Sequence, residues 1–165
     1  MISKANFESY LIEHGKLIYT NVGTSMMPLL RQGRDLFILE RTECRCKVGD
    51  VVLYRRDNSK RYILHRIIEV RADDYVILGD NCSAKEYGIK DDNIIAVMTG
   101  FIRNGIEHSV QEKAYRAYIF VWLRTVTLRV FVKSIVRFTR QCLHELFSMQ
   151  DFIKQKIFRS SQEEL

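Results

Sequence analysis

The feature that most constrains the fold is a series of short apolar runs along residues 17–104, separated by Gly, Asp and Asn. The runs are short and rich in β-branched and aromatic side chains, which is typical of strands in an all-β domain. The polar segment RRDNSKRY predicts a hairpin loop with Asp57 and Asn58 at its turn. We therefore expect about seven strands in this range. The runs are LIYTNVG, DLFILER, GDVVLYRR, RYILHRIIEV, DYVILGDN and NIIAVMTGFIR.

The two flanks of this region have helical character. Residues 5–16 place Phe7, Tyr10 and Leu11 near helical spacing, which predicts a short amphipathic helix. Residues 111–148 contain neither Gly nor Pro, and so long an uninterrupted stretch favours helix over strand. We expect a mainly β protein with an N-terminal helix in residues 1–16, a β-rich core in 17–108 and a basic, amphipathic helical appendage in 109–165.

The chain has a formal charge of +6, and much of the excess lies in residues 114–140, which contain no Asp or Glu. On a helical wheel, one side carries the basic residues Arg129, Lys133, Arg137 and Arg140. The opposite side carries Leu128, Phe131, Val132, Ile135 and Phe138. Each charge at the centre of a bilayer costs about 2.5–3.5 kcal/mol, so this helix is not expected to span a membrane. It is expected to bind either a membrane surface or a partner protein.

Several classes of protein are disfavoured. Cys44 and Cys46 are too close in sequence for an ordinary disulfide, and a metal site would need a second ligand pair that the sequence lacks. We therefore expect reduced thiols and no metal or cofactor. The charged N-terminus has neither a signal-peptide core nor a membrane anchor, which predicts a cytoplasmic or peripheral membrane location. The first 20 residues are too few for a helix-turn-helix, so no nucleic-acid partner is expected.

Candidate catalytic residues lie inside the β-rich region. Ser25 lies in GTSMMPLL, and a serine becomes a nucleophile only when a base removes its proton. His65 lies in a predicted strand on the face opposite Leu64 and Arg66, where a polar ring needs a partner. A buried histidine bonded to a backbone carbonyl is the alternative. Asp80 could cap its own turn, and Glu86 could be a surface charge.

Four stretches, in order, resemble boxes of the type I signal peptidase family, in its endoplasmic-reticulum and archaeal Ser-His branch. GTSMMPLL resembles the nucleophile box, and GRDLFIL resembles the strand after it. VGDVVLYRR with YILHRIIEV resembles the paired strands in which His-Arg replaces the lysine of the bacterial enzymes. VILGDN followed by AVMTGFI resembles the closing boxes. The resemblance covers roughly residues 20–104. Lys60 is the one lysine near His65 in sequence, and we predict a loop position for it.

The resemblance implies a β-rich peptidase core related to LexA-type self-cleaving repressors. Ser25 would attack the scissile carbonyl, His65 would be the general base, and either Asp80 or Glu86 would orient His65. The resemblance also implies that Thr24, Met26, Met27 and Pro28 contact an extended leader or signal peptide.

Gly23 stands where the family usually has a serine that donates into the oxyanion hole. The hole would then depend on the Ser25 N–H and a water, or on the Thr24 hydroxyl. The alternative function is a catalytically impaired module that binds peptide or docks at a membrane without turnover.

Overall fold

The computed structural model describes residues 7–162 except 43, 57, 58 and 60. Asp57, Asn58 and Lys60, which we predicted to lie in a loop, are outside the described residues, as are residues 1–6 of the predicted N-terminal helix. The chain divides into two compact units, Met1–Val126 and Thr127–Leu165.

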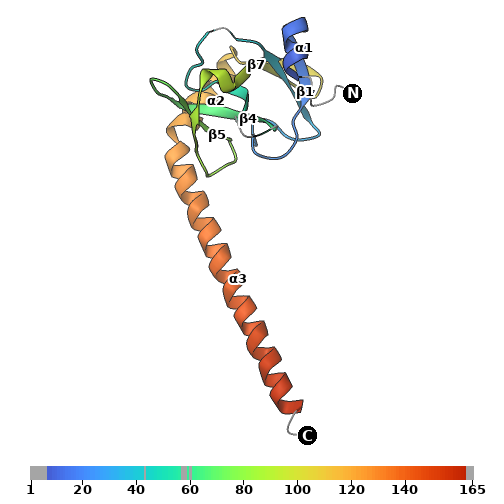
Figure 1. Ribbon diagram of the computed structural model, residues 1–165, viewed down its shortest axis with the longest axis vertical. Helices are drawn as coiled ribbons and strands as arrows, with labels where there is room; N and C mark the ends of the chain where they lie inside the picture. Colours follow the sequence, from blue (N-terminus) through green and yellow to red (C-terminus); the bar gives the residue numbers. More distant parts are fainter. Residues whose placement is uncertain (1–6, 43, 57–58, 60, 163–165) are drawn as a thin grey trace. The chain divides into compact units, whose positions relative to one another are not determined.

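The first unit is built on an antiparallel sheet of eight strands (Figure 1). The strands are β1 (Lys16–Thr20), β2 (Asp35–Glu40), β3 (Val51–Arg55), β4 (Tyr62–Val70), β5 (Tyr75–Leu78), β6 (Glu86–Ile89), β7 (Ile94–Arg103) and β8 (Ile106–Ser109). Among the described residues, the helical elements of this unit are α1 (Phe7–His14), the 3₁₀ helix η2 (Asp91–Asn93) and α2 (Lys113–Arg124). The predicted fold class, mainly β with a short N-terminal helix and a long C-terminal helix, is confirmed.

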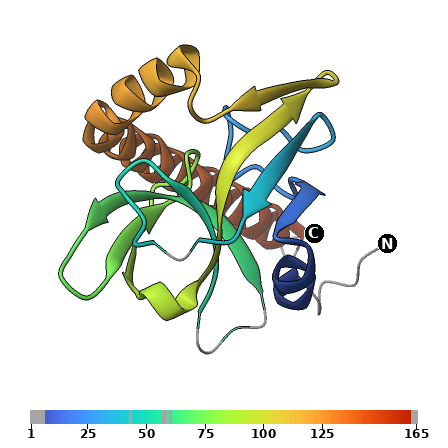
Figure 2. The same cartoon turned by 90° about the horizontal axis from the view of Figure 1, so that it is seen from above.

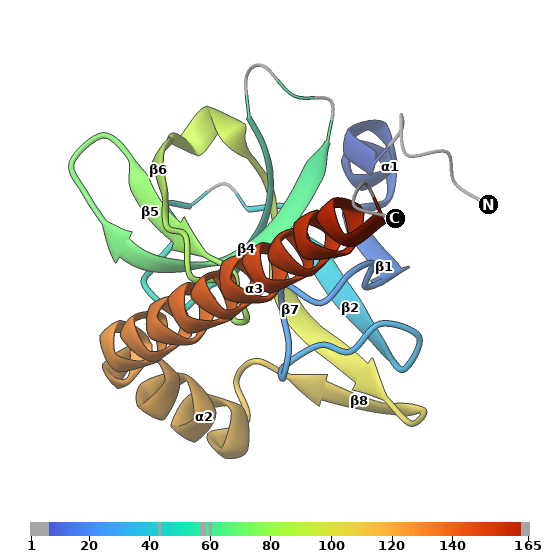
Figure 3. The ribbon, with the colours of Figure 1, turned by 90° about the horizontal axis from the view of Figure 1, so that it is seen from below.

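The strand order places the candidate residues. Along the sheet the order is β1-β2-β7-β3-β4-β5-β6, and β8 pairs with β7. The sheet is strongly twisted (Figure 2), and β4, β5 and β6 lie next to one another in Figure 3. The strand that carries His65 is therefore separated by a single strand from the one that begins at Glu86, while β1 is an edge strand.

The central strands are buried on both faces. Leu53 and Leu64 belong to one apolar cluster, which also takes in Phe7 and Leu11 of α1. Val52 and Tyr54 alternate with Leu53 and belong to a second cluster. Because successive side chains of a strand point to opposite faces, burial on both sides produces continuous apolar runs rather than alternation. This explains the runs seen in the sequence.

The helical segment after the sheet is interrupted at Thr125, where we expected one continuous helix. The Thr125 hydroxyl and amide both donate to the Val121 carbonyl, at 2.9 and 3.1 Å, and α3 (Val126–Gln162) begins after this residue. Tyr115 and Tyr118 of α2 pack against the first apolar cluster, which also contains Leu64. The first compact unit extends to Val126 and includes α2, which packs onto the sheet.

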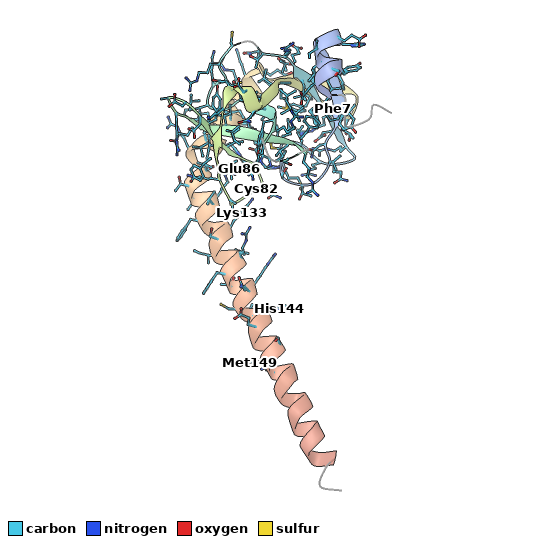
Figure 4. All side chains as sticks on the ribbon, in the orientation of Figure 1. Phe7, Cys82, Glu86, Lys133, His144 and Met149 are labelled. Carbon is cyan, nitrogen blue, oxygen red and sulfur yellow. The ribbon has the colours of Figure 1, made fainter. Side chains whose placement is uncertain are left out.

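The second unit consists of α3, and its apolar side chains are exposed along one side. Leu128 and Phe131 are each 62% exposed and Phe138 is 69% exposed. Lys133, His144 and Met149 are labelled along this helix in Figure 4. Within the described part of the chain, no helix has the length and apolar character needed to cross a membrane.

Candidate active site

His65 and Glu86 form the centre of the candidate site. His65 lies in the middle of β4, paired with Val52 of β3, and its residue surface is 8% exposed. Its Nδ1 lies 2.7 Å from Oε1 of Glu86, the first residue of β6. Glu86 is labelled at the edge of the core in Figure 4. A buried imidazole thus has the carboxylate partner that its position in an apolar strand requires.

Two further side chains hold Glu86. The Arg56 guanidinium donates to Glu86 Oε2, and the Tyr54 hydroxyl, which lies 3.4 Å from His65 Nδ1, also forms a hydrogen bond with the Glu86 carboxylate. Burial by itself would raise the pKa of Glu86, but hydrogen bonds from His65, Tyr54 and Arg56 outweigh it and lower this pKa to about 2. Glu86 is therefore an anion at neutral pH, fixed beside the imidazole.

The environment of His65 favours its protonated form. Burial opposes a charge on the ring, but hydrogen bonds to Cys82 and Glu86 outweigh burial and raise the pKa of His65 to about 9. When the ring loses its proton, a carboxylate at Nδ1 keeps the remaining hydrogen on that nitrogen. Nε2 is then the nitrogen available to accept a proton.

Ser25 and His65 are linked indirectly, because both contact the Gly79–Cys82 turn. Ser25 lies in a compact turn in which Met27 N–H donates to the Thr24 carbonyl at 3.1 Å. The Ser25 carbonyl accepts a 2.7 Å hydrogen bond from Asn81 N–H, and Cys82 N–H donates to the Gly79 carbonyl at 2.8 Å. A Cβ added to Gly79 would lie 2.8 Å from His65 Nε2. Ser25 and His65 thus lie against the same turn, Gly79–Cys82, although no direct hydrogen bond between them is recorded among the described residues.

Gly79 is the residue that allows this close approach. A Gly79→Ala side chain would meet the Cys82 sulfur at 2.7 Å and the His65 ring at 2.8 and 2.9 Å, well inside contact distance. We expect it to displace the imidazole and to destabilise the fold by about 1–3 kcal/mol through overpacking. Thermal unfolding measures the loss of stability. Gly88→Ala, where no atom lies within 4 Å but φ is +73°, is a control for backbone strain alone.

Asp80, the other candidate acid, has a different partner. Its two carboxylate oxygens accept hydrogen bonds from Arg66 Nε and a terminal Arg66 nitrogen at 2.8 and 2.7 Å. The Tyr118 hydroxyl of α2 donates to the same carboxylate at 3.2 Å. Arg66 also donates to the Gly49 carbonyl at 2.7 Å and contacts the Tyr115 hydroxyl at 3.2 Å. Asp80 thus takes part in a buried ion pair that joins β4, the Gly79–Cys82 turn and α2.

A groove of about 550 Å³ lies beside Ser25. Its lining includes Ser25, Thr20 at the end of β1, the next two residues Asn21 and Val22, and Tyr62 and Leu64 of β4. The residues predicted to contact substrate, Thr24, Met26, Met27 and Pro28, are not among the lining residues of this groove. Met26 is fully buried in the first apolar cluster, whereas Thr24 and Pro28 are exposed. A larger cavity of about 730 Å³ is lined by Arg41, Arg55 and Arg56, among others, but by neither Ser25 nor His65.

The backbone conformation at position 23 favours glycine. Its φ is +91°, a conformation that residues with a side chain rarely adopt, and its N–H donates to Gln32 Oε1 at 2.9 Å. A serine at this position would be strained. Among the described residues, no hydrogen bond is recorded for the Ser25 amide N–H, which leaves this donor available to a ligand.

Sequence reasoning missed three contacts of the site, those made by Tyr54, Arg56 and Cys82. Tyr54 could have been found from the hairpin register, because Val52 pairs with His65 and residues two apart in a strand share a face. Arg56 follows the end of β3, and Cys82 follows Gly-Asp-Asn, but neither position carries a motif that points to His65. Their contacts depend on how β6 and its preceding loop return to β4.

Comparison with known proteins gives one informative similarity. No protein-family model matches the chain. Over 93 residues the chain is 32% identical to the signal peptidase complex catalytic subunit SEC11 of Lachancea thermotolerans. The match covers 47% of this chain and 55% of that protein, so the chain spans about half the length of the curated relative it matches. The similarity supports a signal-peptidase-like peptidase at the level of the family.

Proposed function

We propose that the protein is a serine endopeptidase of signal-peptidase type that cleaves a leader or signal peptide. The observation that supports it most directly is the His65–Glu86 pair, 2.7 Å apart, set against the same turn that binds the Ser25 backbone. A nucleophile, a base and an orienting acid are the groups that serine-dependent peptide hydrolysis requires. The similarity to a signal peptidase subunit points to the same chemistry.

Each group has a distinct role in the proposed reaction. The Ser25 hydroxyl attacks the scissile carbonyl while His65 Nε2 takes its proton, and His65 then returns that proton to the leaving amine. Glu86 holds Nδ1–H and stabilises the imidazolium. We assign this role to Glu86 rather than Asp80 because Glu86 contacts the ring directly and Asp80 binds Arg66. The Ser25 N–H is the proposed oxyanion donor, with the exposed Thr24 hydroxyl as the second candidate.

The groove beside Ser25 suits an extended peptide. Thr20 to Val22, at and just after the end of edge strand β1, line one part of it, and Tyr62, Ile63 and Leu64 of β4 line another. An edge strand leaves backbone groups that an added peptide strand can pair with. We propose that substrate contacts come from these lining residues, with Met27 and Pro28 outside the groove and Met26 supporting Ser25 from the core.

A peptidase is distinguished from a binding module by product formation. The non-catalytic alternative draws support from the absence of a recorded Ser25–His65 hydrogen bond among the described residues. The experiment incubates the protein with a library of leader peptides that carry small residues at the cleavage position, and identifies new termini by mass spectrometry. Peptides that bind but stay intact between pH 6 and 10 would overturn the peptidase proposal.

The pH dependence of cleavage follows from the His65 environment. The base must be neutral, and the pKa of His65 is raised to about 9, so kcat/KM should rise with pH and level off above about 9. An inflection near the ordinary value of 6.5 was the expectation from sequence alone. In Glu86→Gln the charge that favours imidazolium is lost, so the inflection should move to lower pH. An unmoved inflection in this variant would show that Glu86 does not act on the base.

The second unit, helix α3, bears on where in the cell the protein acts. We propose that α3 binds anionic membrane surfaces, because its exposed apolar side and the basic side chains along it suit a helix lying in the lipid interface. Each basic residue near an anionic surface contributes about 1 kcal/mol. The double variant Lys133→Glu/Arg137→Glu should therefore bind phosphatidylserine-containing vesicles at least ~10-fold more weakly in co-sedimentation assays. Lys85→Glu/Lys90→Glu, exposed on the core, is the matched control. Equal binding by both double variants would favour docking on a partner protein.

A further inference from the structure

The groove beside the candidate nucleophile has a largely apolar and aromatic lining. Phe37 of β2 and Leu53 of β3 line it and are buried. Phe7 of α1, labelled in Figure 4, lines it too, and its ring centroid lies 4.9 Å from that of Tyr19 and 5.3 Å from that of Tyr62. The volume of about 550 Å³ lies within the range of specific ligand sites. Such a lining suits a bulky apolar side chain of a ligand.

Arg61 is the one charged residue among the described residues that line this groove. It directly precedes β4 and is exposed. Within the described part of the chain, no ion pair or hydrogen bond is recorded for its guanidinium, whereas Arg55 pairs with Glu8 at 3.1 Å. The groove therefore combines apolar surface with one uncompensated positive charge, which an anionic group on the ligand would complement.

Asn21 provides a hydrogen-bond acceptor in the same groove. Its Nδ2 donates to the Gly23 carbonyl at 3.1 Å and contacts the Leu30 carbonyl at 3.4 Å, which fixes the side chain in the loop that carries Ser25. Among the described residues, no partner is recorded for its Oδ1, and no buried side-chain oxygen or nitrogen is left without one. Oδ1 therefore keeps access to solvent, and since Asn21 is only 4% exposed and lines the groove, that access is through the groove.

We propose that this groove selects peptides that carry an acidic side chain close to a bulky apolar one, and that Arg61 is the residue that selects the acid. The apolar side chain packs on the aromatic lining, the carboxylate pairs with Arg61, and Asn21 Oδ1 accepts a peptide N–H. The inference rests on the proposed function, because it names the class of peptide that is presented to Ser25.

The first experiment measures binding without turnover. Ser25→Ala is titrated with fluorescein-labelled peptides that have blocked ends and small residues elsewhere, in which one Phe is followed, at each spacing in turn, by Glu, Gln or Lys. By fluorescence polarisation, the Glu peptide of the best spacing should bind at least ~5-fold more tightly than its Lys counterpart, because repulsion replaces attraction at Arg61. Replacing the Phe by Ala should weaken binding at least ~10-fold through lost apolar burial. Equal affinities for Glu and Lys peptides at every spacing would overturn the proposal.

Reversing the charge at position 61 gives the sharper test. In the double variant Ser25→Ala/Arg61→Glu, the Lys peptide should bind more tightly than the Glu peptide. Ser25→Ala/Arg31→Glu makes the same change at another exposed arginine, which does not line the groove, and should keep the original preference. Circular dichroism verifies that both variants are folded. A preference for Glu that survives Arg61→Glu would show that Arg61 does not select the acid.

A fatty acid is the other ligand that combines a carboxylate with an apolar chain. It has no N–H to donate to Asn21, which favours a peptide as the occupant. Dodecanoate should therefore need at least ~10-fold higher concentration than the unlabelled Glu peptide to displace the labelled one, since it leaves the Asn21 acceptor unpaired. Displacement by dodecanoate at a lower concentration than the peptide requires would assign the groove to a fatty acid and overturn the peptide assignment.

Cleavage separates this inference from the proposed function. With Ser25 intact, kcat/KM for the same peptides should follow the order of their affinities and should reverse between Glu and Lys in Arg61→Glu. Cleavage without any preference between Glu and Lys would refute the selection of an acid while leaving the peptidase intact. A preference in binding by Ser25→Ala, without cleavage of any peptide by the wild type, would instead refute the peptidase.

Discussion

Ser25→Ala is expected to lower kcat/KM for leader-peptide cleavage by about 10⁴- to 10⁶-fold, as loss of the nucleophile does in serine proteases. The expected loss is large because the substitution removes the hydroxyl that forms the covalent intermediate in the proposed reaction. His65→Ala should have an effect of similar size, because a serine without a base is inert. Residual turnover would come from binding and the oxyanion donor alone.

The double variant gives a sharper result than either single variant. Residues that act as one unit are strongly non-additive, so Ser25→Ala/His65→Ala should be about as slow as either variant alone. Ser134→Ala, which removes an exposed α3 hydroxyl bonded to the Val130 carbonyl, is the matched control and should cleave at the wild-type rate. Initial rates by mass spectrometry, with circular dichroism to verify folding, provide the measurement. Cleavage by Ser25→Ala at the wild-type rate would exclude Ser25 as the nucleophile.

Local patterns in the sequence were sufficient for the strands, and they singled out His65 as a residue that needs a polar partner. The apolar runs between polar turns located the strands because local alternation and turn chemistry dominate there. His65 was singled out because a polar ring in an apolar strand needs a partner, and the structure supplies one in Glu86. Ser25 was identified by the resemblance of its box to the signal peptidase family.

The choice between Asp80 and Glu86 could not be made from sequence, because it depends on non-local strand order. Asp80 follows β5 directly and Glu86 opens β6, so both are near β4 along the sheet. Arg66 and His65 are adjacent in β4 and point to opposite faces. Each acid meets the residue on its own face: Asp80 meets Arg66, and Glu86 meets His65. The packing of α2 could not be predicted for a related reason, since the contacts of Tyr115 and Tyr118 with Arg66 and Asp80 link α2 to distant strands.

Asp80→Ala is expected to destabilise the core by about 3–5 kcal/mol, because it leaves the Arg66 guanidinium without its counter-charge in the interior. Both side chains are almost completely buried, with relative exposures of 0% for Arg66 and 1% for Asp80. Urea unfolding followed by fluorescence of Trp122, which stacks on Tyr118, measures the free energy of unfolding of the core. Glu69→Ala, which removes an exposed partner of Arg71 at 2.9 Å, is the matched control and should change stability by less than about 1 kcal/mol.

Further variants separate the charge of Asp80 from its hydrogen bonds and from catalysis. Tyr118→Phe removes one donor to Asp80 and should cost about 1 kcal/mol. The double variant Arg66→Met/Asp80→Leu removes both charges and should recover much of the stability lost in Asp80→Ala, since a buried ion pair can be replaced by apolar side chains of similar volume. If Asp80→Ala instead kept wild-type stability but lost cleavage as completely as Ser25→Ala, Asp80 would act on the chemistry, and the role proposed for Glu86 would have to be reassigned.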